Sequence, residues 1–76
     1  MAFYNRGLAY FYKREFEKAV EDYDQAIRLN PNYAMAIFNR GQAKLKMGDK
    51  ASAEQDMAQA KQINPKVADE ALNPTR

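Results

Sequence analysis

Apolar residues recur at intervals of three and four along much of the chain, the spacing that places side chains on one face of an α-helix. The stripe is clearest where it comprises Phe16, Ala19, Val20, Tyr23, Ala26 and Ile27. Charged residues fill the positions between them, and the pattern predicts that they face water: Glu15, Glu17, Glu21, Asp22, Asp24 and Arg28. The segment is therefore predicted to be an amphipathic helix with one buried face.

Proline and glycine divide the chain into further helices. Asn30-Pro31 and Asn64-Pro65 each predict a helix end, because proline disfavours helical geometry in the residue before it, and each proline can then open the next helix. Gly48 can adopt the left-handed conformation that ends a helix, and Asp49 can cap the helix that follows. We expect helices near residues 2–13, 16–29, 32–47 and 50–63, and a helical stub near 66–72.

The sequence also repeats itself at one fixed shift, which carries position 5 onto position 39. Asn5-Arg6-Gly7 aligns with Asn39-Arg40-Gly41, and Asn30-Pro31 aligns with Asn64-Pro65. Further matches join Ala9 to Ala43, Ala19 to Ala53, Asp22 to Asp56, and Gln25-Ala26 to Gln59-Ala60. Because a fixed period of this length is the mark of stacked helical units, the chain is predicted to contain two copies of one helix-turn-helix unit.

The period and the residues that recur resemble the tetratricopeptide repeat, whose pattern has the same period and places aromatic, small and proline residues at fixed intervals within it. In the first copy the matching residues are Phe3, Gly7, Tyr10, Ala19, Tyr23, Ala26 and Pro31. In the second copy they are Ile37, Gly41, Ala53, Met57, Ala60 and Pro65. Arg6 and Arg40 replace the leucine of the pattern, and Lys44 replaces its tyrosine.

This resemblance implies an all-α fold, a right-handed superhelical stack of antiparallel helix-turn-helix hairpins. We expect one domain over residues 1–76, with repeat 1 at about 1–33, repeat 2 at about 34–67 and a capping helix stub at about 66–73. The recurring glycines, Gly7 and Gly41, are expected where two helices cross closely. Arg14 occupies the place of Gly48 in the first hairpin, so its turn should be the weaker one. Glu54 and Lys61 replace Val20 and Ile27, as expected where no further repeat packs.

Composition argues against several classes of function. The chain has no cysteine and no histidine, which removes disulfides, thiolate nucleophiles, the commonest zinc ligand and the commonest general base. We therefore predict a protein that is not an enzyme and needs no cofactor or metal. Charges interrupt every apolar run, so we expect neither a membrane span nor a signal peptide. The sequence does not determine the compartment, and a cytoplasmic location is the expectation.

The resemblance also implies a binding site for a protein or peptide, since the first helix of each tetratricopeptide hairpin lines a concave groove. Matched residue by residue, the groove comprises Tyr4, Asn5, Leu8, Phe11, Tyr12, Phe38, Asn39, Gln42, Leu45 and Lys46. A second interpretation stays open for part of this set. Tyr4, Phe11 and Phe38 can instead pack between neighbouring first helices, and Asn5 and Asn39 can serve internal hydrogen bonds.

Two alternatives to peptide binding remain. The first helix is apolar around most of its circumference, which also fits a chain that lacks a neighbouring repeat or forms a homodimer, with or without exchange of a hairpin at Asn30-Pro31-Asn32. The net charge of +2 is mild, and Lys13, Arg14, Lys44, Lys46 and Lys50 are dispersed rather than gathered in one stripe. Binding to nucleic acid is therefore disfavoured against binding to protein.

Overall fold

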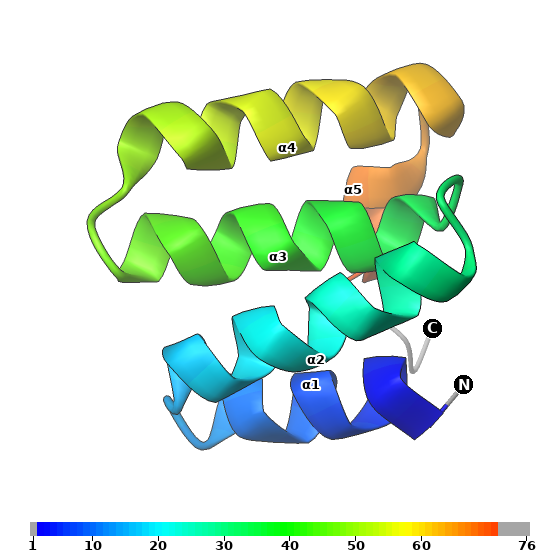
Figure 1. Ribbon diagram of the computed structural model, residues 1–76. Helices are drawn as coiled ribbons and strands as arrows, with labels where there is room; N and C mark the ends of the chain where they lie inside the picture. The colour runs from blue at the N-terminus through cyan, green and yellow to red at the C-terminus, as the bar shows by residue number, and fades with distance from the viewer. Residues whose placement is uncertain (1, 72–76) are drawn as a thin grey trace.

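A computed structural model of the chain describes residues 2–71 and contains helical hairpins stacked side by side (Figure 1). The described helices are α1 (Ala2–Tyr12), α2 (Phe16–Leu29), α3 (Ala34–Lys46), α4 (Lys50–Ile63) and α5 (Val67–Ala71). Antiparallel helices α1 and α2 form one hairpin, and α3 and α4 form the next. The fold is thus an all-α stack of helical hairpins, which confirms the predicted fold class.

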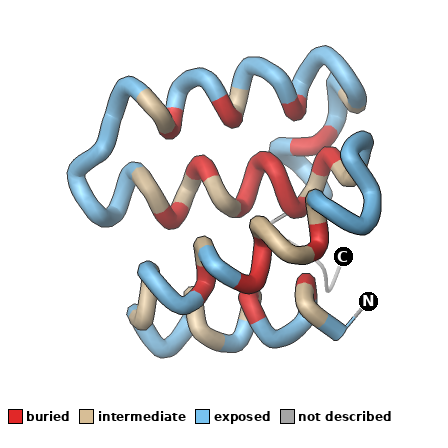
Figure 2. Tube along the Cα trace, viewed as in Figure 1, coloured by how far each residue is buried: buried red, intermediate tan, exposed pale blue. Residues whose placement is uncertain are grey.

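The core lies between the helices, and the residues that face outward on α4 and α1 are largely exposed (Figure 2). Helix α3 is central, because it packs against α4, α2 and α5. Two clusters of buried side chains hold the stack together. One contains Tyr4, Tyr23 and Ala36 and joins the two hairpins, and the other contains Ile37, Phe38 and Val67 and joins α3 to α5. Burial of these apolar surfaces is the main stabilising contribution.

Glycine permits the close crossing of the helices within each hairpin. A Cβ atom added to Gly7 would lie 2.8 Å from Cε1 of Tyr23, and one added to Gly41 would lie 3.0 Å from the carbonyl oxygen of Ala53. Both separations are so short that a side chain at either position would displace its neighbour. The packing role predicted for the recurring glycines is therefore confirmed.

The turn inside each hairpin has the same backbone geometry. The amide of Glu15 donates to the carbonyl of Tyr10, and the amide of Asp49 donates to that of Lys44, both at 2.9 Å. This arrangement needs a left-handed residue one position earlier. In the second turn the left-handed residue is Gly48, with φ of 91°, and in the first turn it is Arg14, with φ of 65°. The strain predicted for the first turn is thus present.

Capping side chains also distinguish the two hairpin turns. The Asp49 carboxylate accepts a hydrogen bond from the amide of Ser52 at 3.3 Å, as the sequence predicts. Glu15, at the corresponding place before α2, makes no side-chain cap. The first turn therefore lacks both the glycine and the cap that stabilise the second turn.

The connection between the hairpins differs from the prediction in one respect. Helix α3 begins at Ala34 rather than near residue 32, because Pro31 lies in a turn instead of opening the helix. In that turn the Asn30 side chain accepts from the amide of Asn32, and its carbonyl accepts from the amide of Tyr33. Asn64 repeats both bonds before α5, which begins at Val67. Each asparagine thus satisfies two backbone amides before or at the start of the next helix, where the helix itself offers them no acceptor.

Helix α5 covers one side of α3, where Val67 is fully buried beside Ile37 and Phe38. Residues 72 and 73 of the predicted capping segment lie outside the described residues. On α4, Glu54 and Lys61 are exposed, in agreement with an outer face that packs against no further helix among the described residues.

Replacing Gly41 by leucine should destabilise the protein, because the new side chain would push α3 away from the backbone of α4. We expect Gly41→Leu to lower the free energy of unfolding by about 1–3 kcal/mol, the usual cost of overpacking. Urea unfolding followed by circular dichroism measures this change. Ala51→Leu, at an exposed position of α4, is the matched control and should change stability by less than about 0.5 kcal/mol. Equal effects of the two substitutions would contradict the close crossing.

Replacing Arg14 by glycine should stabilise the protein. A side chain in the left-handed region costs about 1–2 kcal/mol, and the extra entropy of glycine in the unfolded chain offsets about 0.5–1 kcal/mol of the gain. We expect a net increase of up to about 1 kcal/mol in the free energy of unfolding for Arg14→Gly. The reverse change, Gly48→Arg, should lower it. Unchanged stability in both variants would argue against strain at the first turn.

Candidate functional site

The structure divides the residues predicted for the groove into interior and accessible sets. Tyr4, Phe38 and Asn39 are interior, with 6%, 5% and 0% of their surfaces exposed. Leu8, Phe11 and Gln42 are half-buried. The remaining predicted residues are exposed: Asn5, Tyr12, Leu45 and Lys46. The residues at the turn end of α1 and α3 are thus the more accessible part of the predicted groove.

Tyr4 and Asn39 contact each other at the boundary between the hairpins. The Asn39 amide donates a hydrogen bond of 3.0 Å to the Tyr4 hydroxyl. The Tyr4 ring lies against Tyr23 and Tyr33, with centroid distances of 5.9 and 5.1 Å. Burial raises the pKa of Tyr4 to about 12, and the nearby Tyr33 acts in the same direction. These side chains lie inside the packed boundary between the hairpins. Tyr4 and Asn39 therefore make internal contacts, as the second interpretation of the sequence expects.

Two of the exposed residues, Tyr12 and Lys46, lie at a hollow beside the first hairpin turn. This hollow, which we call the turn cleft, has a volume of about 360 Å³ and is lined by Phe11, Tyr12, Arg14, Phe16 and Lys46. Phe11 is central, because its ring packs in a T-shaped geometry with the rings of Tyr12 and Phe16, at centroid distances of 5.7 and 5.4 Å. Segments far apart in sequence, the α1–α2 turn and the end of α3, therefore meet at one hollow, which is lined by both aromatic and cationic side chains.

The charged side chains that line the turn cleft are both positive. Its lining contains the cations of Arg14 and Lys46 and no carboxylate. Within residues 2–71, neither cation forms an ion pair. An adjoining hollow reaches Met47 and includes the carboxylates of Glu15 and Glu17, of which Glu15 is paired with Lys18 at 3.1 Å. The two cations of the turn cleft are therefore available to an anionic group.

Sequence reasoning found part of this cleft and missed the rest. Phe11, Tyr12 and Lys46 were assigned to the groove by their place in the repeat, whereas Arg14 and Phe16 were assigned to a turn and to the hairpin core. Their position on the cleft depends on how the first turn folds beside the end of α3. The unusual arginine at a glycine position was the one signal in the sequence that pointed to it.

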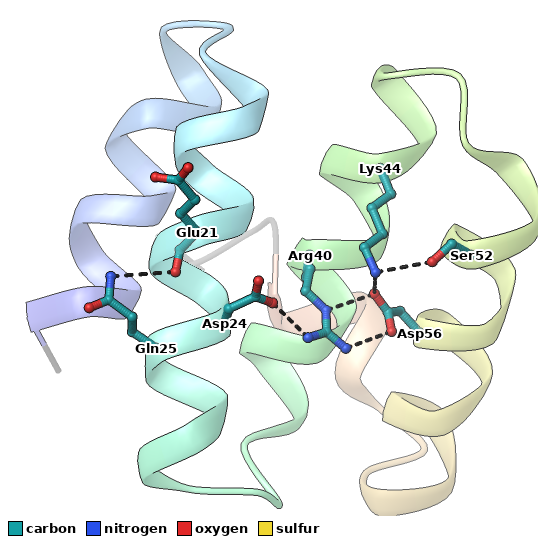
Figure 3. A network of polar contacts seen from close by, with 7 residues as sticks. All are labelled: Glu21, Asp24, Gln25, Arg40, Lys44, Ser52 and Asp56. Carbon is teal, nitrogen blue, oxygen red and sulfur yellow. Dashed lines mark hydrogen bonds and ion pairs between the residues drawn. The ribbon is translucent and has the colours of Figure 1, made fainter.

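Paired arginine and aspartate side chains recur in both hairpins. Arg6 donates two hydrogen bonds of 2.8 Å to Asp22, and Arg40 donates bonds of 2.9 and 2.8 Å to Asp56. Arg40 also reaches across to Asp24 on α2 at 2.8 Å (Figure 3). These pairs sit beside the crossing glycines and join α1 to α2 and α3 to α4.

The prediction that Asp22 faces water is wrong. Asp22 is 3% exposed and Asp56 is 5% exposed, because each carboxylate lies under the guanidinium that it binds. Asp24, predicted on the same solvated face, is half-buried in its contact with Arg40. Arg6 and Asp22 both recur one repeat period later, as Arg40 and Asp56, and pairing these two recurring charges would have found the contact.

The charge network continues along α3 and α4. Lys44 lies 3.3 Å from the Asp56 carboxylate and donates a hydrogen bond to the Ser52 hydroxyl at 3.0 Å (Figure 3). The ion pair between Lys44 and Asp56 does not indicate a catalytic site, because buried charges are paired to offset their loss of hydration. Removing Arg40 would leave Asp24 and Asp56 without their shared cation.

Comparison with known families agrees with this architecture. Two family models, each described as tetratricopeptide repeat, match the chain over residues 1–33 and 22–55. The chain belongs to the tetratricopeptide repeat family. A search of curated proteins finds no match.

Membership in this family has general consequences for function. Tetratricopeptide domains generally mediate protein–protein interaction or scaffolding and are typically non-enzymatic. Among residues 2–71, no helix combines the length and the hydrophobicity needed to cross a membrane.

Replacing Asn39 by alanine should destabilise the protein, because the change removes the donor to the buried Tyr4 hydroxyl. We expect the free energy of unfolding to fall by about 1–3 kcal/mol in Asn39→Ala. The matched control is Asn5→Ala, at the same place in the first hairpin, where the side chain is exposed and the loss should be below about 0.5 kcal/mol. Urea unfolding of both variants measures the difference. Equal losses would contradict the internal role of Asn39.

Proposed function

We propose that this chain is a non-enzymatic interaction module that binds an acidic segment of another protein through the turn cleft. The observation that carries the proposal is the lining of that cleft, in which aromatic rings and two cations meet without a carboxylate. An anionic peptide with an apolar anchor side chain matches both features. The anchor would lie on Phe11 and Tyr12, and the carboxylates would lie near Arg14 and Lys46.

Physical chemistry supports this partner over a neutral one. Aromatic rings supply contact area at low conformational cost, so they serve as anchors in protein interfaces. Unpaired cations at the rim attract carboxylates and accelerate their association. Because one small cleft offers few anchoring contacts, we expect a dissociation constant in the micromolar range, which corresponds to a binding free energy of about −8 kcal/mol.

The backbone of Arg14 provides a second line of support. The corresponding residue of the second hairpin is Gly48, which adopts the same left-handed region without strain. Strained residues are often found at functional sites, where the side chain is needed despite its cost. An arginine in this position places a guanidinium at the cleft, which a glycine would not do.

The other predicted groove residues have two proposed roles. Leu8, Gln42 and Leu45 would continue the contact surface from the cleft along α1 and α3. Tyr4, Phe38 and Asn39 are buried, so they would hold the wall of the groove rather than touch the partner. Asn5 is exposed, but it lies outside the lining of the turn cleft.

The alternatives receive less support. The homodimer was suggested by the aromatic surplus of the first helix, yet Tyr4 is buried within the chain, and Phe3, Tyr10 and Phe11 pack partly against its core. RNA binding would need a stripe of available cations. Lys44 is instead engaged with Asp56 and Ser52, which leaves Arg14 and Lys46 at the cleft as a small patch.

Peptide binding can be tested with fluorescence polarisation. Three labelled peptides are compared: a phenylalanine flanked by aspartate and glutamate, the same peptide with alanine in place of phenylalanine, and one with lysines in place of the acids. We expect micromolar binding of the first peptide and at least tenfold weaker binding of the other two. Lys46→Glu and Tyr12→Ala should each weaken the first peptide about tenfold, or about 1.4 kcal/mol.

Matched variants separate the cleft from general charge and stability effects. Lys61→Glu makes the same charge change on the exposed side of α4 and should leave affinity within about twofold. Arg14→Gly should bind more weakly although its fold is more stable. Equal affinity for the acidic and basic peptides, or equal effects of Lys46→Glu and Lys61→Glu, would contradict the proposal, as would tighter binding to single-stranded RNA.

A further inference from the structure

The turn cleft continues into the adjoining hollow. Each hollow has a volume of about 360 Å³, and the two share Arg14 and Phe16 as lining residues. Lys46 lines the turn cleft, and the next residue, Met47, lines the adjoining hollow. The α1–α2 and α3–α4 turns lie at the same edge of the stack (Figure 1). Because the hollows share two residues, they form one continuous surface along that edge.

The two hollows differ in charge. The turn cleft is lined by two cations and no carboxylate, whereas the adjoining hollow includes the carboxylates of Glu15 and Glu17. Glu15 is paired with Lys18, whose ammonium also lies over the Tyr10 ring at 5.6 Å from its centroid. Glu17 is exposed and forms no ion pair with any residue that the structure describes. Glu17 therefore supplies the carboxylate that is available to a cation at this end of the surface.

Apolar side chains accompany the Glu17 carboxylate. Phe16 belongs to the wall that the two hollows share, and Met47 lines the adjoining hollow with 45% of its surface exposed. A lysine or arginine has an aliphatic stem that can cover apolar surface and a cationic head that stays hydrated. Met47 and Glu17 together match the two parts of such a side chain.

The carboxylate at position 17 is not a requirement of the hairpin fold. One repeat period later, Gly48 replaces Arg14 and Ala51 replaces Glu17. Helix α4 forms without an acidic residue in its first turn, whereas α2 has Glu17 there. A carboxylate near the start of a helix interacts favourably with the helix dipole, and an exposed one keeps this interaction while it binds a cation. Both signs of charge are thus a property of the first turn and not of the repeat.

We infer that the segment bound by this chain carries charges of both signs: acidic residues beside the apolar anchor of the turn cleft, and one lysine or arginine that enters the adjoining hollow. This inference rests on the proposed function, because the anchor must first occupy the turn cleft. The stem of the lysine or arginine packs on Met47, and its cation pairs with Glu17. The order and spacing of the two charge types then select the partner.

A second peptide series, measured by fluorescence polarisation, tests this surface. The parent peptide has phenylalanine flanked by aspartate and glutamate. Each new peptide adds one lysine, placed two, three or four residues before or after the phenylalanine, and has a matched peptide with glutamine in that place. Because the chain has a net charge of +2, a lysine without a local partner should weaken binding. We expect one placement to bind about three- to fivefold more tightly than its glutamine match.

Variants of the chain identify the residues that produce this gain. Glu17→Gln should remove it and leave the affinity for the glutamine peptide within about twofold. The matched control is Glu54→Gln, which removes the same charge from an exposed position of α4 outside both hollows and should keep the gain. Glu17→Lys should reverse the preference, so that glutamate at the selected placement binds more tightly than lysine. Met47→Ala should weaken the lysine peptide more than the glutamine peptide. Circular dichroism checks that each variant is folded.

The outcomes separate the adjoining hollow from the turn cleft. A gain at one placement that depends on Glu17 and Met47 would support the proposal. If the parent peptide binds and no lysine placement exceeds its glutamine match, the adjoining hollow has no role and the acidic peptide remains a ligand of the turn cleft. A gain that persists in Glu17→Gln, a gain that Glu54→Gln removes equally, or equal weakening of both peptides by Met47→Ala would also overturn the proposal. Binding of no peptide in the series would overturn this proposal and the proposed function together.

Discussion

Within each hairpin the two helices approach so closely that Gly7 and Gly41 have no room for a methyl group. The other contacts of the hairpin depend on this spacing. It brings Arg6 within 2.8 Å of the Asp22 carboxylate and Arg40 within 2.8 Å of the Asp56 carboxylate, although each pair is separated by 16 residues in the chain. Wider spacing would leave two nearly buried carboxylates without their cations, which is costly. The close crossing therefore fixes both the packing and the charge pairing of each unit.

Joining the two hairpins depends on a different set of contacts, and here identical residues have unlike surroundings. Asn39 is completely buried against Tyr4, whereas Asn5, its counterpart, is exposed. Arg40 bridges α2 and α4, whereas Arg6 binds within its own hairpin. The residue type determines which bonds a side chain can form, but the neighbouring hairpin determines which of those bonds are made. Equivalent residues of a helical repeat thus differ in burial according to the hairpin that packs against them.

The first turn combines local strain with accessible chemistry. The second turn has both a glycine in the left-handed position and an aspartate cap, and a Cβ atom added to that glycine would meet nothing within 4 Å. The first has Arg14 in the left-handed position and no side-chain cap, and it borders the turn cleft. Regions with fewer stabilising contacts commonly serve as binding sites because stability and function make different demands on the same residues. The proposed binding site is accordingly at the less stable of the two turns.

The sequence by itself determined the elements of this protein and the repeat that relates them. Local rules suffice for that level, because apolar spacing, Gly48-Asp49 and the Asn-Pro steps act over a few residues, and they placed α2 and α4 at their observed bounds. Even the strain at Arg14 followed from its alignment with glycine. The start of α3 was missed because the side chain and carbonyl of Asn30 bind the amides of Asn32 and Tyr33 and hold this segment in a turn. Only the tertiary structure decided which side chains are buried, as Asp22, Tyr4 and Asn39 illustrate, and which meet at the turn cleft. Burial depends on what a neighbouring helix covers, and a periodic pattern is the same whether or not that neighbour is present.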